Sequence, residues 1–156
     1  MTMDSLHTLS ESTQLIHQLF YYLDESRNDD LIVLFAPEGK WHRQGQILTG
    51  RAQILQAMLQ RSATQRIRHV ITNGFITSTS PVAVQFVAYM TAYRFDDGTL
   101  HVGAVNITQA LRLSVVRATL QQTAGVWNIA ELTLTPEFEF ILPETAIQSS
   151  KMEKQL

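Results

Sequence analysis

The hydrophobic period of this chain changes near residue 65, and this change restricts the possible folds more than any other feature. Before it, apolar side chains recur at the spacing of a helix. The first such stripe consists of Leu15, Ile16, Leu19, Phe20 and Leu23. After it, apolar and polar side chains alternate over long segments rich in β-branched residues, as in strands. Helices followed by strands, without βαβ alternation, indicate an α+β fold with an antiparallel sheet.

Turn and capping residues divide the first half into expected elements. We expect a helix over residues 10–27, a short second helix ended by Pro37, a strand and turn over 38–48, and a third helix after Gly50. A sheet that curls around the long helix would leave an apolar cavity, which is the usual place for a ligand.

The second half is expected to form the longer strands, ending at Pro136. Their predicted ranges are 66–77, 82–95, 110–122 and 126–135. The dipeptide Asp97-Gly98 is a strong turn signal between two of these strands. The segment 99–109 shows no clear period, so no element is predicted for it.

Composition indicates one globular domain and excludes several classes of function. The chain has 156 residues, 45% of them apolar, and we expect one domain over 1–142 with a polar tail over 143–156. A net charge of −2 without a basic block predicts neither a nucleic-acid nor a membrane partner. The absence of cysteine excludes disulfides and thiolate chemistry, and together with the lack of a visible signal segment it leads us to expect a cytoplasmic protein.

No familiar cofactor or metal motif occurs in the sequence. The patterns GxGxxG, GxxxxGK[ST], HExxH and GxSxG are all absent. His42 and His69 do not have a ligand spacing with carboxylates. We therefore predict no metal and no cofactor.

His69 is the most informative candidate for chemistry. It belongs to an alternating set with Ile67, Ile71, Asn73 and Phe75. It is either a core histidine bonded to the backbone or a general base that faces a cavity, because imidazole exchanges protons near neutral pH.

Asp24 follows Leu23 at the end of the first expected helix. It is either a polar helix-end residue or a carboxylate that faces the same cavity and orients the ring of His69.

Aromatic residues supply the candidates for the cavity wall. Trp41 and His42 alternate on one strand, so only one faces inward, and Trp41 is the better candidate. Tyr89 and Tyr93 could each place a hydroxyl at the cavity or pack in the core with a wet tip. Phe75, in the same alternating set as His69, is a further candidate.

Several ordered segments resemble the SnoaL-like branch of the NTF2-like superfamily. They are LDESRNDDLIVLFAPEGKWHRQGQILTGRAQIL, RIRHVITNGFI and AGVWNIAELTLTPEF, within residues 10–140. The resemblance implies an NTF2-like cone, in which a strongly curved antiparallel sheet wraps N-terminal helices around an apolar cavity, and it implies a homodimer.

By this resemblance, Asp24 and His69 match the catalytic aspartate and first catalytic histidine of scytalone dehydratase-type members. Leu23 stands where those members have a tyrosine, and Tyr93 is the loose match of their second histidine. The groups that polarise a carbonyl therefore differ in this chain.

Two functions of different classes remain open. The first is a cofactor-independent lyase or isomerase, dehydratase- or cyclase-like, with an apolar small-molecule ligand. In it His69 abstracts a proton, Asp24 orients His69, and Tyr93 or Asn73 holds the oxygen. The rival is a non-catalytic ligand-binding or scaffold protein, including a role like the small subunits of ring-hydroxylating dioxygenases.

Overall fold

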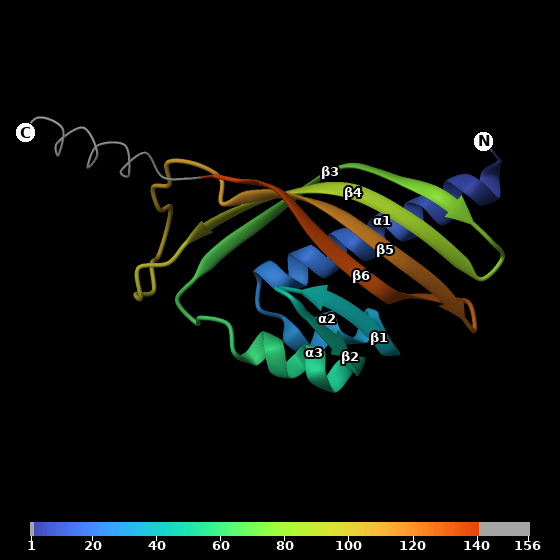
Figure 1. The fold of residues 1–156 in the computed structure, drawn as a ribbon, viewed down its shortest axis with the longest axis horizontal. Coiled ribbons are helices and arrows are strands. Elements are labelled where there is room, and N and C mark those ends of the chain that lie inside the picture. Colours follow the sequence, from blue (N-terminus) through green and yellow to red (C-terminus); the bar gives the residue numbers. More distant parts are fainter. Residues whose placement is uncertain (1, 141–156) are drawn as a thin grey trace, which may run out of the picture.

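The computed structural model describes residues 2–140, which form three helices and six strands (Figure 1). The helices are α1 (Met3–Asp24), α2 (Asn28–Val33) and α3 (Gly50–Leu59). The strands are β1 (Phe35–Arg43), β2 (Gln46–Thr49), β3 (Arg66–Thr79), β4 (Ala83–Phe95), β5 (Arg112–Thr123) and β6 (Val126–Glu139). The boundary expected between 142 and 143 lies outside the described residues.

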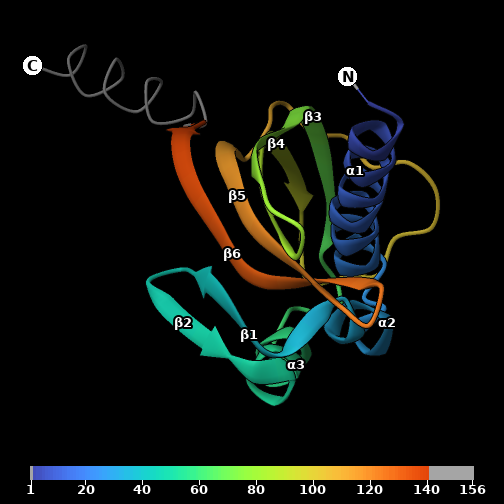
Figure 2. The same ribbon diagram turned by 90° about the vertical axis from the view of Figure 1, so that its right-hand side faces the viewer.

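The six strands form one curved, unclosed sheet in the order β2-β1-β6-β5-β4-β3. Every neighbouring pair is antiparallel except β1 and β6, which run parallel, so the sheet is mixed. Figure 2 shows α1 alongside the sheet near β3, with α2, α3, β1 and β2 gathered at one end. This arrangement confirms the α+β, NTF2-like cone.

Helix α1 begins earlier than its apolar stripe predicts. The side chain of Thr2 accepts a hydrogen bond from the backbone N–H of Ser5 at 3.2 Å, which is an N-cap. The helix then runs to Asp24, and Glu25 follows as its C-cap. The apolar stripe over 15–23 is buried against the sheet, and this burial provides most of the stabilisation of the helix.

Two prolines lie inside strands, where the sequence predicts that they end elements. Pro37 lies within β1, and α2 already ends at Val33. Pro136 lies within β6 opposite Ser114, next to a register shift in the pairing of β5 with β6. An irregular ladder tolerates a residue that has no N–H to donate.

The core lies between α1 and the concave face of the sheet. Its largest fully buried side chains are Trp41, Phe20, Phe35 and Phe86. Within residues 2–140, no helix has the length and apolarity needed to cross a membrane. Residues 99–109 form neither helix nor strand, and the guanidinium of Arg66 donates to the carbonyls of His101 and Gly103 there.

Candidate functional site

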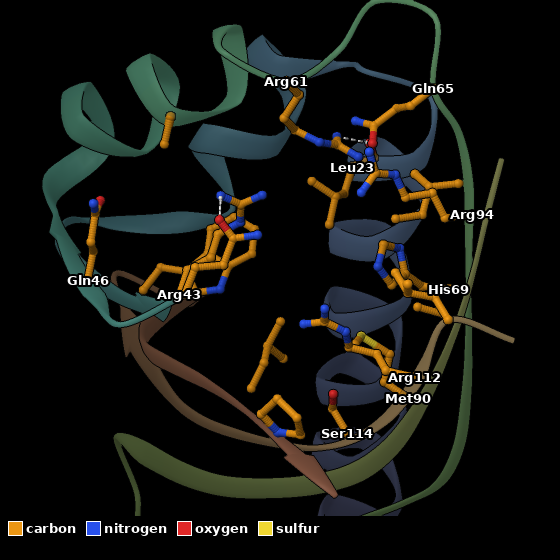
Figure 3. A pocket seen from close by; sticks show the side chains of 18 of the residues that line it. Leu23, Arg43, Gln46, Arg61, Gln65, His69, Met90, Arg94, Arg112 and Ser114 are labelled. Carbon is orange, nitrogen blue, oxygen red and sulfur yellow. Dashed lines mark hydrogen bonds between the residues drawn. The ribbon is translucent and has the colours of Figure 1, made fainter. Parts of the chain in front are cut away.

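A cavity of about 630 Å³ opens between the sheet and the end that carries α3 (Figure 3). Apolar side chains on its wall include Leu23, Trp41, Leu48, Ala57, Ile67, Met90, Ala92, Leu111, Leu134 and Pro136. Its polar wall includes His69, Ser114, several glutamines and the arginines Arg43, Arg61, Arg94 and Arg112. The expectation of an apolar cavity is therefore wrong, because four guanidinium groups share the wall with the apolar side chains.

Asp24 and His69 form a buried pair at this cavity. The Nδ1 atom of His69 lies 2.5 Å from Oδ1 of Asp24, and the backbone N–H of His69 donates to Oδ2 at 2.8 Å. Their side chains are only 7% and 6% exposed. One carboxylate therefore fixes both the main chain and the ring of the same residue.

The positions of α1 and β3 explain this contact. Among the six strands of residues 2–140, β3 lies at the edge of the sheet, so its outward N–H groups have no neighbouring strand there to bond. Asp24 ends α1, which packs against β3, and its carboxylate accepts one of these N–H groups. The pair thus satisfies a backbone donor while it orients the ring.

The ring of His69 lies at the cavity wall, whereas Asp24 lies behind it. His69 lines the main cavity, and Asp24 lines a separate, smaller recess. Because a carboxylate accepts at Nδ1, the neutral ring carries its proton there and leaves Nε2 with a lone pair. Within residues 2–140, Nε2 has no hydrogen-bond partner, so it is available to a ligand.

Trp41 lies on the cavity wall, where the sequence predicts it. Its ring is 1% exposed and stacks on Phe35 at a centroid distance of 5.7 Å. Its indole Nε1 is buried without a hydrogen-bond partner among the described residues. The hydroxyl of Ser114, also on the wall, is in the same state. Both are buried polar atoms without a hydrogen-bond partner among the described residues, and such atoms are rare inside proteins.

Tyr89 and Tyr93 lie outside the cavity, contrary to the sequence expectation. On β4 they alternate with the buried residues Met90 and Ala92, which line the cavity, so the two tyrosines face the other side of the sheet. Their side chains are 46% and 37% exposed. Tyr93 therefore cannot hold a substrate oxygen beside His69.

A β-bulge in β3 explains why Phe75 and Asn73 also lie outside the cavity, where the sequence did not predict them. Thr72 pairs with Tyr89 and Phe75 with Val87, so β3 contains one extra residue here. Asn73 sits in this bulge with a φ of 56° and is exposed. The extra residue reverses the alternation, and Phe75 faces outward at 54% exposure.

The four cavity arginines are functional candidates that the sequence reasoning missed. Burial lowers the pKa of Arg43 and of Arg61. The charges of Arg43 and Arg94 lower the pKa of Arg61 further, against an opposing effect of Asp24. Strand alternation was the available signal, because Arg94 continues the inward-facing set that contains Met90 and Ala92.

Among residues 2–140, no group of three or more histidine, aspartate and glutamate side chains is placed to hold a metal ion. The acceptors and donors at the cavity include the imidazole, the hydroxyl, the indole and the guanidinium groups described above, together with the glutamine side chains.

The chain belongs to the SnoaL-like domain family, whose family model matches residues 4–133. This agrees with the resemblance of the sequence segments. A comparison with curated protein sequences finds no match.

Solved structures of several similar proteins share the fold. A proposed scytalone dehydratase from Novosphingobium aromaticivorans has a TM-score of 0.74 and 14% identity, over 90% of this chain and 93% of that one. ActVI-ORFA from Streptomyces coelicolor has a TM-score of 0.68 and 15% identity, over 82% and 96%. A proposed aromatic ring hydroxylase from N. aromaticivorans has a TM-score of 0.69 and 14% identity, over 87% and 94%.

Proposed function

We propose that this protein is a cofactor-independent lyase or isomerase that uses His69, oriented by Asp24, as a general base. The observation that carries the proposal is the 2.5 Å contact between Asp24 and Nδ1 of His69 beside a cavity large enough for a small cyclic molecule. Membership in the SnoaL-like family is compatible with a role of the lyase or isomerase type, or with ligand binding.

The proposed reaction begins with proton transfer to Nε2 of His69 from a carbon next to a carbonyl. The C–H electron pair moves into a new C=C bond, and the carbonyl oxygen gains negative charge. In a dehydration, the enolate then expels a β-hydroxyl, which leaves as water with the proton from His69. In an isomerisation, the same proton returns to another carbon. The Asp24 carboxylate stabilises the imidazolium that exists between the two steps.

Ser114 takes the role that the sequence assigned to Tyr93 or Asn73. Its hydroxyl is buried at the cavity wall without a hydrogen-bond partner among residues 2–140, and it would donate to a developing enolate oxygen once a small side-chain movement brings the two into contact. The indole N–H of Trp41 is a second such donor. Donors without a partner in the free protein are suited to a charge that forms only during reaction.

Deuterium exchange tests the base without knowledge of the natural substrate. A panel of cyclic β-hydroxy ketones and β,γ-unsaturated ketones is incubated with the protein in D₂O, and deuterium at the α-carbon is followed by NMR. Exchange or turnover by the wild type, and its loss in His69→Asn, supports the proposal. Saturable binding of the same ketones without exchange favours the ligand-binding rival instead.

The outer face of the sheet further supports a homodimer, which we include in the proposal. Val70, Phe75 and Tyr89 are 47%, 54% and 46% exposed on this face. They lie on the neighbouring strands β3 and β4, opposite the buried side. Apolar side chains that share one exposed face are typical of an interaction surface.

A further inference from the structure

Four arginines lie around one cavity in a chain whose net charge is −2. In Figure 3, Arg94, His69, Arg112 and Ser114 follow one wall, Arg43 lies on the opposite wall, and Arg61 lies above them. Within the described part of the chain, the residues that line this cavity include no aspartate or glutamate. Positive charge is therefore concentrated at the site.

Among residues 2–140, the hydrogen bonds of these arginines leave most of their N–H donors without an acceptor. Arg61 donates to the carbonyl of Leu23 at 2.5 Å, and Arg43 to the side chain of Gln44 at 3.3 Å. The Nε atom of Arg112 is buried without a hydrogen-bond partner among the described residues. A guanidinium has five N–H donors in a planar fork, so several remain for a ligand.

Nearby carboxylates offset only part of this charge. Asp96 lies 3.8 Å from Arg94, and Glu139 lies 3.5 Å from Nε of Arg112, beyond a good hydrogen bond. Asp24 lies behind the imidazole and is occupied by it. None of the three lines the cavity. From residues 2–140, an anion that enters the cavity meets hydrogen-bond donors and no competing carboxylate.

We infer that the ligand of this cavity is a small organic anion, with a carboxylate or phosphate head held by Arg94 and Arg112 and an apolar body against the half-buried side chains of Ile67 and Leu111 on the wall. Guanidinium groups match such oxyanions with paired N–H donors. This inference rests on the proposed function for the site, and it replaces the apolar small-molecule ligand that the sequence predicts.

The anionic head also has a consequence for the reaction. A head group fixed by two arginines beside His69 places the rest of the molecule along the wall that carries Nε2 and Ser114. The binding energy of the head group, which does not react, then serves to orient the portion of the ligand that reacts at His69.

Calorimetry with matched probes tests the inference at low ionic strength. The probes are 2-naphthoate, 2-naphthyl phosphate and the neutral 2-naphthamide, which share one ring system. Because charge-assisted hydrogen bonds are about twice as strong as neutral ones, we expect at least one anion to bind about tenfold or more tightly than the amide. Added sodium chloride should reduce this preference, since salt screens the attraction.

Variants then locate the binding site. Arg94→Gln and Arg112→Gln should each weaken anion binding about three- to tenfold and leave the affinity for the amide nearly unchanged. Arg117→Gln is the matched control, because Arg117 is exposed on β5 and does not line the cavity. Equal binding of anions and amide, no binding of any anion, or equal effects of all three substitutions would overturn the inference.

His69→Asn separates this inference from the proposed function. The variant lacks the base but keeps both arginines, so its preference for the anion should persist. The ketone panel is therefore extended with ketones that carry a carboxylate group. Anion preference without deuterium exchange by any of these ketones would refute only the base. Exchange by the wild type without anion preference would refute only the anionic ligand.

Discussion

Asp24 holds His69 at two points, through its ring and through its backbone N–H, and both contacts are buried. The ring is therefore fixed in one orientation and one tautomer before any ligand arrives. A helix that ends in a carboxylate and an edge strand with a free N–H are sufficient to build this arrangement.

Substitution of the pair should affect exchange to different degrees. His69→Asn should abolish α-proton exchange, because among residues 2–140 no other histidine and no carboxylate lines the cavity. Asp24→Asn should keep ligand binding but lower the rate by about 10²- to 10⁴-fold, since an amide cannot stabilise the imidazolium. Rates from NMR and affinities from calorimetry distinguish these effects. Normal exchange by His69→Asn would contradict the assignment.

Tyr93→Phe serves as a control for that prediction. Its hydroxyl lies on the opposite face of the sheet, so the exchange rate should stay within about twofold of the wild type. A loss comparable to that of Asp24→Asn would restore the role that the sequence resemblance implies for Tyr93.

Ser114→Ala should reduce activity without reducing stability. The hydroxyl is buried and has no partner among the described residues, so its removal should leave the free energy of unfolding unchanged or raise it by up to about 1 kcal/mol. If the hydroxyl donates to the enolate oxygen, exchange should slow by about tenfold or more. Denaturant unfolding and the exchange assay measure the two effects. A large loss of stability would show a structural role instead.

Gly74 and Phe86 form a close contact that determines the packing under the bulge. A Cβ at position 74 would lie 2.8 Å from Cζ of Phe86. Gly74→Ala should therefore lower the free energy of unfolding by about 1–3 kcal/mol through overpacking. The double variant with Phe86→Leu should recover part of this loss in denaturant unfolding. Equal losses in the single and double variants would contradict the contact.

The proposed dimer through the outer face of the sheet predicts that a substitution on this face changes the mass of the particle in solution. Tyr89→Lys places a charge among the exposed apolar residues and should shift the protein from dimer to monomer in sedimentation velocity. Gln121→Lys, at an exposed position of β5 outside this group, is the matched control. A wild type that sediments as a monomer would refute the dimer.

The fold was predictable because the hydrophobic residues of the long helix and the long strands keep the regular spacing of those elements. The helical stripe ending at Leu23 and the alternation in β4 both lead to the observed layers. The contact of Asp24 with His69 was expected and is present, while its catalytic role stays a prediction. The positions of Asn73 and Phe75 could not be predicted. The extra residue at the bulge is not visible in the sequence alternation, yet it moves the side chains directly after it in β3 to the opposite face of the sheet.

The cavity arginines illustrate a second limit of prediction from the sequence. Alternation alone assigns Arg94 and Arg112 to the inward face, yet charged residues near strand ends are usually solvated. Only the three-dimensional arrangement shows that the ends of β1, β4 and β5 meet at one cavity. The nature of the ligand thus depends on long-range contacts that no local pattern records.

Asp97 provides a pH-dependent contact in the loop after β4. Hydrogen bonds lower its pKa from 3.8 to about 2, mainly from the hydroxyl of Thr99 and then from His101. Because the folded-state pKa is lower than the unfolded value, this contribution to loop stability is fully present above pH 3.8. It should be lost as the pH falls toward 2.

An NMR titration of the Asp97 carboxyl carbon should therefore give a midpoint near 2 in the wild type. Thr99→Val removes the hydroxyl donor at 2.7 Å and keeps the shape of the side chain, so the pKa should rise toward 3.8. Thr77→Val is the control, since the hydroxyl of Thr77 bonds the carbonyl of Gln85 on another part of the sheet. A wild-type midpoint near 3.8 would show that Thr99 and His101 do not hold the carboxylate in solution.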